Sequence, residues 1–350
     1  MIKILQVRNI DSFVESRRQK TSEKDRKTVQ SILNDVRKNG DSAVKKYERK
    51  FNGRKTSQLR VSAKEIKEAR SKISREEVTA LQTMSVRLSN SSPKIQIRGS
   101  RKFVAIPSVG CYIPGGQARY PSSVVMSVIP AKIAGVKRIV IVSPPDRDGK
   151  IDPLTIVAAK KCGATEIYKI GGAQAIGALA YGTKSIPKVD KIVGPGGKFV
   201  SIAKSLVSDQ TAIDMVAGPT ELGIIADASS DPELIALDLI SQAEHSRDTM
   251  CFVITQSKTM AKQIQKSIEK LIPGTERSSI IKESISKNGF IAVCKNQNEM
   301  IELANKFAPE HMELMVKNAK TLSKKLTVAV LFLIGKTTPT AVRYYLRGNT

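Results

Sequence analysis

The feature that most constrains the fold is a pattern that repeats from residue 138 onward: an apolar strand, a loop rich in glycine or proline, and a helix. It predicts strands, each followed by its helix, over residues 139–143 and 153–162, 166–170 and 173–181, and 191–193 and 198–207. It resumes with strands and helices predicted over 251–255 and 258–271, then 290–294 and 299–307. A last apolar run predicts a strand over 326–334, before a terminal helix near 340–346. Such alternation predicts a parallel sheet with helices on its faces.

Glycine-rich loops follow two of these strands. Gly171-Gly172 and the run from Gly194 to Gly197 each lie between a strand and a helix. Neither loop has the complete GxGxxG spacing, but the two together favour a dinucleotide site. The turn Pro114-Gly115-Gly116 and the helix start at Pro121-Ser122-Ser123 expose backbone N–H groups, which can face an anion or simply form a turn. Both interpretations of these two segments stay open.

The stretch Thr211–Arg247 contains a second candidate site. Asp231 is a good N-cap for an amphipathic helix that ends near Gln242 and His245. These two side chains are three residues apart, so on a helix they leave from one face and can reach one point. An imidazole beside an amide oxygen can hold a metal ion or a polar ligand, although two donors do not complete a zinc site.

The position of this helix also predicts a ligand site. The helix follows a short strand over 223–225 that ends at Ala226-Asp227. Open α/β sheets bind ligands at the carboxyl ends of their strands. The helix therefore begins at the kind of sheet edge where a ligand is expected.

The chain contains only two histidines, and each follows a glutamate: Glu244-His245 and Glu310-His311. A neutral imidazole is the natural base near pH 7, and an adjacent carboxylate can tune it or act on a water molecule. From spacing alone, a catalytic and a structural role for His311 remain equally open.

The charge balance raises the question of an acidic partner. The chain has 58 Lys and Arg against 32 Asp and Glu, a formal net charge of +26. The basic residues are dispersed, and no basic block is interleaved with aromatic residues as in single-strand binders. A soluble basic surface is therefore favoured over nucleic-acid binding.

The remaining composition indicates a cytoplasmic protein. The four cysteines are far apart in the sequence, as expected for reduced and mostly buried thiols: Cys111, Cys162, Cys251 and Cys294. No signal peptide opens the chain, and no apolar run reaches membrane-spanning length. The first 90 residues predict helices over 22–38, 42–51 and 62–90, which form a scaffold or a dimer arm.

Several longer runs of the sequence resemble the histidinol dehydrogenase family, in the order of that family. They are YIPGGQARYPSSVVM (112–126), GGAQAIGALAYGT (171–183), VDKIVGPGGKFV (189–200), IDMVAGPTEL (213–222), SQAEH (241–245) and FAPEHMEL (307–314). The resemblance implies a zinc-dependent, cytoplasmic homodimer. It also implies that the chain oxidises L-histidinol to L-histidine through an aldehyde, with two NAD and one water, in the last steps of histidine biosynthesis.

The resemblance also implies roles for particular residues. Glu310 and His311 resemble the catalytic acid/base pair, in which His311 takes protons in both oxidation steps and Glu310 helps to activate the water. The other implied roles are substrate binding by Thr220, Gln242, His245 and His311, zinc binding by Gln242 and His245, and NAD binding by Tyr112 and Gln174.

Three departures from the family pattern accompany the resemblance. Gly197 stands where the family has an Asn that contacts NAD, and Tyr344 stands where it has an Asp zinc ligand. The family continues beyond the position of Thr350 with a further Glu and a zinc-binding His. We therefore expect an incomplete zinc site, since zinc takes three or four protein donors. The alternatives are a catalytically impaired homologue with a binding or regulatory role and, less favoured, a basic nucleic-acid-associated protein.

The fold class expected from these observations is α/β, with two Rossmann-like lobes of parallel strands flanked by helices and an N-terminal helical region. The larger lobe is expected over residues 1–111 and 221–350. The NAD-binding lobe is expected as an insertion over residues 112–220.

Overall fold

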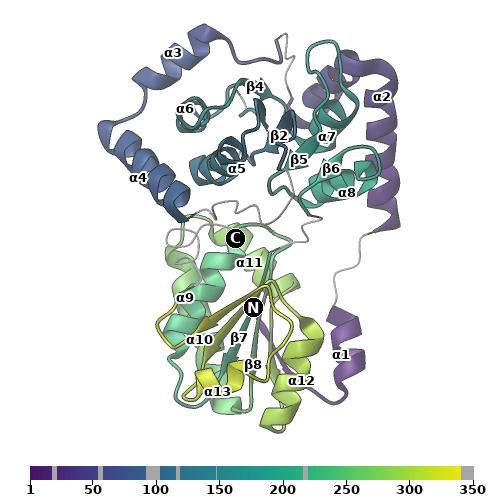
Figure 1. Cartoon of the computed structure of the whole chain (residues 1–350). Coiled ribbons are helices and arrows are strands. Elements are labelled where there is room, and N and C mark those ends of the chain that lie inside the picture. The colour runs from purple at the N-terminus through teal and green to yellow at the C-terminus, as the bar shows by residue number, and fades with distance from the viewer. Residues whose placement is uncertain are drawn as a thin grey trace. The chain divides into compact units, whose positions relative to one another are not determined.

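The protein is an α/β protein that folds into two compact units (Figure 1). The first unit is built from residues 1–20 and 219–343, and the second mainly from residues 21–218. The computed structural model describes residues 1–17, 22–53, 58–91, 103–115, 119–146, 148–215 and 220–339.

The first unit contains a six-stranded parallel sheet. Its strands, in spatial order, are β1 (Lys3–Gln6), β9 (Phe290–Val293), β8 (Met250–Thr255), β7 (Glu221–Ala226), β10 (His311–Met315) and β11 (Leu331–Ile334). All neighbours pair in parallel. After β7 the chain adds β8 and β9 on one side and then returns to β10 on the other. The topological switch point therefore lies between β7 and β10.

Helices cover both faces of this sheet. One face packs against α9 (Pro232–Ala243), α10 (Lys258–Leu271) and α11 (Ser278–Lys287). The opposite face packs against α1 (Ile10–Arg17), α12 (Gln297–Phe307) and α13 (Ala319–Ser323). A sheet that is covered on both faces explains why its strands are apolar runs without alternation.

The second unit contains a five-stranded parallel sheet. Its strands, in spatial order, are β4 (Glu166–Lys169), β3 (Arg138–Ser143), β2 (Ser108–Tyr112), β5 (Lys191–Val193) and β6 (Ala212–Ile213). All neighbours again pair in parallel. The order changes direction between β2 and β5, which is the switch point of this sheet.

Helices also cover both faces of the second sheet. One face packs against α2 (Glu23–Asn52), α7 (Gly172–Tyr181) and α8 (Lys198–Val207). The other packs against α3 (Ala63–Ser71), α4 (Arg75–Ser91), α5 (Pro121–Ile133) and α6 (Pro153–Cys162). The expected fold class, two Rossmann-like lobes with flanked parallel sheets and N-terminal helices, is confirmed.

The N-terminal helices belong to a different unit from the one expected. Helices α2, α3 and α4 lie in the second unit, whereas the sequence placed residues 1–111 in the first. The reason is burial, because α2 contributes its apolar stripe to a core shared with α7 and α8. Only β1 and α1 of the N-terminal segment belong to the first unit. The chain passes from the second unit to the first at residues 218–219.

The predicted turn between residues 38 and 42 is a kink within α2. Gly40 has φ 51° and ψ −128°, a conformation that favours glycine, and the helix continues beyond it. The expected helix over 62–90 divides into α3 and α4, and Ser62 caps α3 through a capping box with Glu65. The apolar run at 326–334 forms only the short strand β11, and the expected terminal helix lies outside the described residues.

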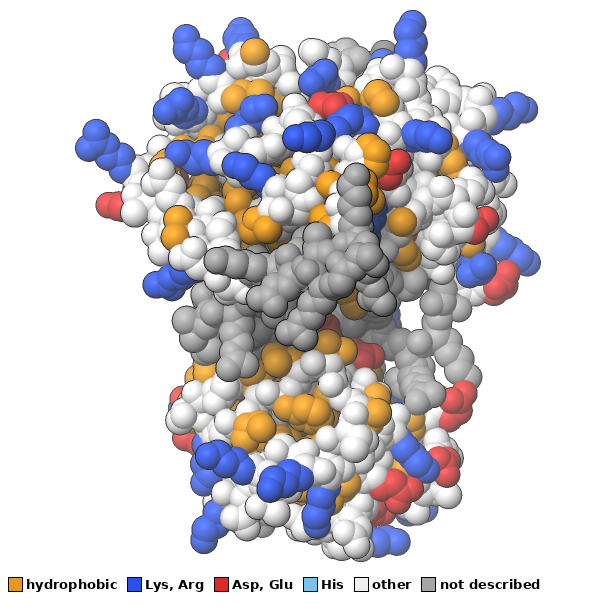
Figure 2. Space-filling model, in the orientation of Figure 1, with side chains coloured by type: hydrophobic (Ala, Val, Ile, Leu, Met, Phe, Trp, Pro, Cys, Tyr) orange, Lys and Arg blue, Asp and Glu red, His pale blue; other side chains and the backbone are white. Residues whose placement is uncertain are grey.

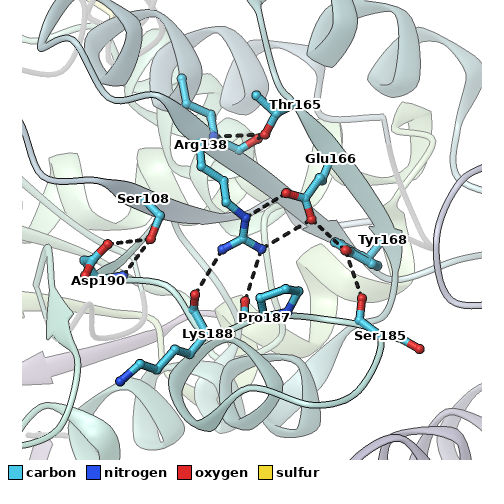
Figure 3. A network of polar contacts seen from close by, with 10 residues as sticks. Ser108, Arg138, Thr165, Glu166, Tyr168, Ser185, Pro187, Lys188 and Asp190 are labelled. Atoms are coloured by element: carbon cyan, nitrogen blue, oxygen red, sulfur yellow. Dashed lines mark hydrogen bonds and ion pairs between the residues drawn. The ribbon is translucent and has the colours of Figure 1, made fainter.

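A polar network stabilises the amino edge of the second sheet (Figure 3). Arg138, the first residue of β3, forms an ion pair with Glu166 at 2.7 Å and donates to the carbonyl oxygen of Lys188 at 3.0 Å. The Tyr168 hydroxyl donates to Glu166 at 2.6 Å and to the carbonyl oxygen of Ser185 at 3.0 Å. The network ties the 185–190 loop to the starts of the strands, so we interpret it as structural.

All four cysteines are free and buried, in agreement with the sequence. Burial raises the pKa of Cys111 and of Cys294 to about 12, so these thiols stay protonated and unreactive. Among the helices of the described residues, none combines the length and apolarity that crossing a membrane requires.

Candidate functional site

Helix α9 positions two of the candidate residues. The Asp231 side chain accepts from the backbone N–H of Glu233 at 2.8 Å, and Pro232 occupies the first helical position. The apolar side of α9 packs on β7 and β8, so the polar side chains near its end are drawn into the protein. Gln242, in its last turn, is only 2% exposed.

The candidate residues of α9 lie at the amino edge of the first sheet, although the helix begins at the carboxyl edge. Helix α9 begins after the carboxyl end of β7 but runs back along the sheet, so its own end returns to the edge where the strands begin. Gln242 and His245 therefore lie near the start of β8, at Met250. The start of the helix at Asp231 and Pro232 agrees with the sequence prediction.

Strand β10 brings Glu310 and His311 to the same edge. His311 is the first residue of β10 and pairs in register with Leu222 of β7. Its imidazole is fully buried, with Nδ1 3.2 Å from the carbonyl oxygen of Glu221 and 3.7 Å from Oε2 of Glu310. The strand was not predicted, because a segment that carries Pro309, Glu310 and His311 resembles a loop.

His245 is electrostatically linked to the same group of residues. Its side chain keeps exposed surface, but protein atoms crowd the ring, and this loss of hydration is the largest cause that lowers its pKa. Glu244 and Glu310 act in the opposite direction, and Arg277 also lowers the pKa. A lowered pKa favours the neutral imidazole, which is the form that binds a metal or accepts a proton.

Thr220 lies immediately before β7 at this edge. Its carbonyl oxygen accepts from the backbone N–H of Met250 at 3.1 Å, and the following residue, Glu221, contacts His311. The structure thus gathers at one edge of the first unit the residues Thr220, Gln242, His245, Glu310 and His311.

The candidate cofactor residues belong to the second unit and lie at the carboxyl edge of its sheet. Tyr112 ends β2, and its hydroxyl oxygen accepts from the backbone N–H of Gly172 at 3.1 Å. Burial raises the pKa of Tyr112 to about 12, so the hydroxyl keeps its proton. Gln174 is 1% exposed, and its Oε1 has no hydrogen-bond partner among the described residues. A buried amide oxygen without a donor fits a polar ligand group such as a hydroxyl or a carboxamide of NAD.

The first glycine loop does not offer its backbone to a phosphate. Glu48 of α2, which is fully buried, accepts from the backbone N–H of Gly171 at 2.9 Å and from Nε2 of Gln174 at 2.8 Å. A carboxylate of the protein therefore occupies the start of α7, where an anion would otherwise bind. The protein itself therefore caps this helix start, and the dinucleotide site expected from the two glycine loops stays a prediction.

The second glycine loop packs closely against β2, and this explains why its first residue is a glycine. Gly194 has φ 107°, and a Cβ there would lie 2.2 Å from the carbonyl oxygen of Tyr112. The backbone N–H of Gly194 donates to Asp214 at 2.8 Å, and Asp214 forms an ion pair with Lys204. At Gly197, by contrast, a Cβ would meet nothing within 4 Å. Among the glycines of this loop, Gly194 lies too close to β2 for a side chain, whereas Gly197 has room for one.

The described residues do not complete a zinc site. Gln242 and His245 supply an amide and an imidazole, whereas zinc takes three or four protein donors. No group of three or more His, Cys, Asp or Glu side chains suited to a metal occurs within the described ranges. Tyr344 lies outside those ranges.

Two cavities lie away from the candidate residues. One, of about 410 Å³, lies beside the amino edge of the second sheet and is lined by Arg60, Ser62 and Glu166, among others. The other, of about 390 Å³, lies at the carboxyl ends of β7 and β8 and is lined by Asp227, Gln256 and Lys317, among others. Neither cavity volume indicates which ligand would bind, so the candidate site is assigned from its side chains.

Sequence reasoning missed two buried carboxyls beneath the site. Asp238 lies one helical turn before Gln242, and Glu313 lies two residues after His311. Both are buried, at 8% and 0% exposure. The spacings i, i+4 on a helix and i, i+2 on a strand were the signals that could have found them.

The architecture defines the class of protein. A crystal structure of an aldehyde dehydrogenase from Bartonella henselae superposes on this chain with a TM-score of 0.52 at 11% identity, over 94% of this chain and 82% of that one. At this identity the likeness is one of fold, and it places the chain among two-unit α/β proteins of this architecture.

The chain belongs to the histidinol dehydrogenase family, whose model matches residues 15–350. Histidinol dehydrogenases from Oceanobacillus iheyensis and Bacillus cereus are 41% and 43% identical over 331 and 334 residues. These alignments cover 91% and 92% of this chain and 78% and 77% of the relatives. A crystal structure of histidinol dehydrogenase from Elizabethkingia anophelis superposes with a TM-score of 0.87 at 32% identity, over 99% of this chain and 83% of that one.

Proposed function

We propose that this protein oxidises L-histidinol to L-histidine through an aldehyde, with two molecules of NAD and one water, in the last steps of histidine biosynthesis. Membership of the histidinol dehydrogenase family supports this activity. The observation that carries the site assignment is the convergence of Gln242, His245, Glu310 and His311 on one edge of the first sheet. These are the groups that an alcohol oxidation followed by hydration needs: a hold on the substrate, a base and a carboxylate.

In this proposal His311 removes the proton of the substrate hydroxyl in each oxidation. Its Nδ1 faces the carbonyl oxygen of Glu221, and a carbonyl only accepts, so Nδ1 carries the proton and Nε2 is the basic nitrogen. Glu310, which keeps exposed surface, accepts a proton from the water that adds to the aldehyde. Thr220 contacts the substrate hydroxyl from the start of β7.

Gln242 and His245 hold the imidazole and amine of the substrate in this proposal. The Nε2 atom of Gln242 is buried and has no hydrogen-bond partner among the described residues, so its amide is available to a polar ligand. Fixing the carbinol carbon in one position is a large part of what such contacts contribute, because orientation alone lowers the barrier considerably.

NAD supplies the chemistry of hydride acceptance, taking two electrons in each oxidation. Tyr112 and Gln174 are proposed to bind it, since one keeps a donatable proton and the other has a buried amide oxygen without a donor among the described residues. We assign no step to zinc, because the described donors are fewer than zinc takes.

The proposal is tested with the purified chain, L-histidinol and NAD. We expect two NADH for each histidine formed, measured by absorbance and amino-acid analysis, with the metal content determined in parallel. Absence of NAD reduction in a folded sample loaded with zinc contradicts the proposal. Size-exclusion chromatography with light scattering tests the proposed homodimer, and cell fractionation tests the proposed cytoplasmic location.

The second candidate is a homologue with impaired turnover and a binding or regulatory role. The specific observation in its favour is that only two zinc donors are identified among the described residues. It predicts histidinol or NAD binding by calorimetry without NADH formation. Nucleic-acid binding is less favoured, since Lys and Arg side chains are scattered on the face drawn in Figure 2 and do not form one stripe.

A further inference from the structure

We propose that Asp238 and Glu313 form a carboxyl pair that shares one proton and positions Gln242 and His311. Both carboxyls would then be positioning residues for the reaction proposed above, on which this inference depends only for the identity of that reaction. The pair joins helix α9 to strand β10, and these elements carry the two groups it positions.

The register of the sheet places Glu313 on the α9 face. His311 and Glu313 pair with Leu222 and Ile224 of β7. Register partners in a parallel sheet point to the same face, and Leu222 and Ile224 pack in the core that contains α9. His311 and Glu313 therefore both point toward α9.

The spacing along the two elements then aligns Gln242 with His311. From Asp238, four residues along the helix advance about 6 Å to Gln242. From Glu313, two residues back along the strand cover about 6.6 Å to His311. Helix α9 runs antiparallel to the strands, so both steps lead toward the amino edge. A contact between Asp238 and Glu313 therefore fixes the positions of Gln242 and His311 relative to each other along the sheet.

The two carboxyls contact each other out of water. Glu313 is fully buried, and neither of its oxygens has a donor partner among the described residues. Asp238 is 8% exposed and within hydrogen-bonding reach of Glu313. Two carboxylates are both acceptors, so a hydrogen bond between them exists only when one of them holds a proton. Burial, followed by Asp238, raises the pKa of Glu313 to about 9, in agreement with a proton that stays on the pair at neutral pH.

The hydrogen bond between the two carboxyls is directional, so it can fix the register of α9 against β10, which apolar packing does not. Burying a polar pair contributes little net stability compared with well-packed apolar side chains, but it favours one register of the elements that it joins. Loss of that register moves Gln242 and His311 relative to each other. A displacement of this kind is costly in catalysis even when the fold survives.

The test uses the fact that the chain has only two histidines. In the full chain labelled with ¹⁵N-histidine, imidazole NMR signals are assigned with the variant His245→Asn. We expect Glu313→Gln to leave the His311 signals in place and kcat within about threefold, because Gln donates to Asp238 as the protonated acid does. The double variant Asp238→Leu/Glu313→Met is expected to keep or raise Tm, shift the His311 signals and lower kcat roughly 10- to 100-fold.

Ser284→Ala is the control for general loss of a buried hydrogen bond in the same unit. The Ser284 hydroxyl is fully buried and donates to the carbonyl oxygen of Thr249 at 2.9 Å. This variant should lower Tm without shifting the His311 signals. The proposal is overturned if the apolar double variant keeps both the signals and kcat, or if Glu313→Gln loses as much kcat as the double variant does. A wild-type chain without histidinol oxidation rejects the proposed function, and the imidazole spectra still decide whether the pair positions His311.

Discussion

The two units have the same architecture but carry their candidate residues at opposite edges of their sheets. In the second unit, Tyr112 and the Gly194 loop lie at the carboxyl edge, beside the switch point between β2 and β5. In the first unit, the switch point lies between β7 and β10, but His311 lies at the amino edge. The comparison teaches that topology predicts where a sheet can bind a ligand, whereas the ends of particular helices decide where the reactive groups are.

Each unit also contains a buried acidic residue, and the two differ in their hydrogen-bond partners. Glu48 accepts from two N–H donors, which satisfies it as an internal cap of α7. Glu313 faces a second acid and must keep a proton. One buried acid stabilises a fixed loop, and the other joins two elements that carry candidate reactive groups.

The largest expected effect tests which edge of the first sheet is active. His311→Asn removes the proposed base at the amino edge, so kcat should fall by roughly 10²- to 10⁴-fold, as expected for loss of general-base catalysis. The matched variant Gln256→Ala alters the cavity at the carboxyl edge and should change kcat by less than about twofold. Steady-state NADH formation measures both. If Gln256→Ala is the more damaging change, the active edge has been assigned wrongly.

A smaller effect is expected for the carboxyl edge of the second unit. Gln174→Leu removes the proposed buried polar contact to NAD, so KM for NAD should rise about tenfold while KM for histidinol stays unchanged. Glu48→Gln, which keeps an acceptor for Gly171, is the control and should leave both values nearly unaltered. Equal changes in the two KM values for Gln174→Leu contradict separate binding by the two edges.

Glu313 also predicts a pH dependence of stability. The folded-state pKa of Glu313, about 9, exceeds its reference value of 4.5, so the folded state binds more protons between these pH values. The free energy of unfolding therefore decreases as pH rises from about 4.5 to 9. Glu313→Gln removes this contribution, so its Tm should exceed that of the wild type by a margin that grows with pH and levels off above pH 9. A margin independent of pH argues against a protonated Glu313.

The smallest expected effect concerns Gly197. A side chain fits there, and Gly197 is the N-cap of α8 without a side-chain hydrogen bond. Gly197→Asn should stabilise the protein slightly, by a few tenths of a kcal/mol. It should also lower KM for NAD about two- to threefold if the side chain reaches the cofactor. Gly197→Ala separates the two effects, since it fills the space without adding a polar group.

The fold was largely predictable because strand and helix alternation is a local pattern. The strands after residue 138 lie within a few residues of their predicted positions, and Asp231 caps α9 as expected. The short strands β1, β6 and β10 were not predicted, because their sequences are polar or very short and only pairing in the sheet defines them.

The site was predictable to the level of residue type but not of position. The Gln242–His245 spacing and the two Glu-His pairs identified the candidate groups. Three features depend on long-range contacts that spacing alone cannot supply: the amino edge, the Glu48 cap and the Asp238–Glu313 contact. The placement of the N-terminal helices failed for the same reason, since only burial of α2 assigns it to a unit.

The internal cap of α7 has a consequence for turnover under the proposed function. With Glu48 at the start of α7, the pyrophosphate of a dinucleotide cannot accept the hydrogen bonds that a helix N-terminus usually donates. Weaker retention shortens the time for which each cofactor stays bound. Such rapid exchange suits a four-electron reaction, because NADH must dissociate and a second NAD must bind while the aldehyde intermediate stays in the site.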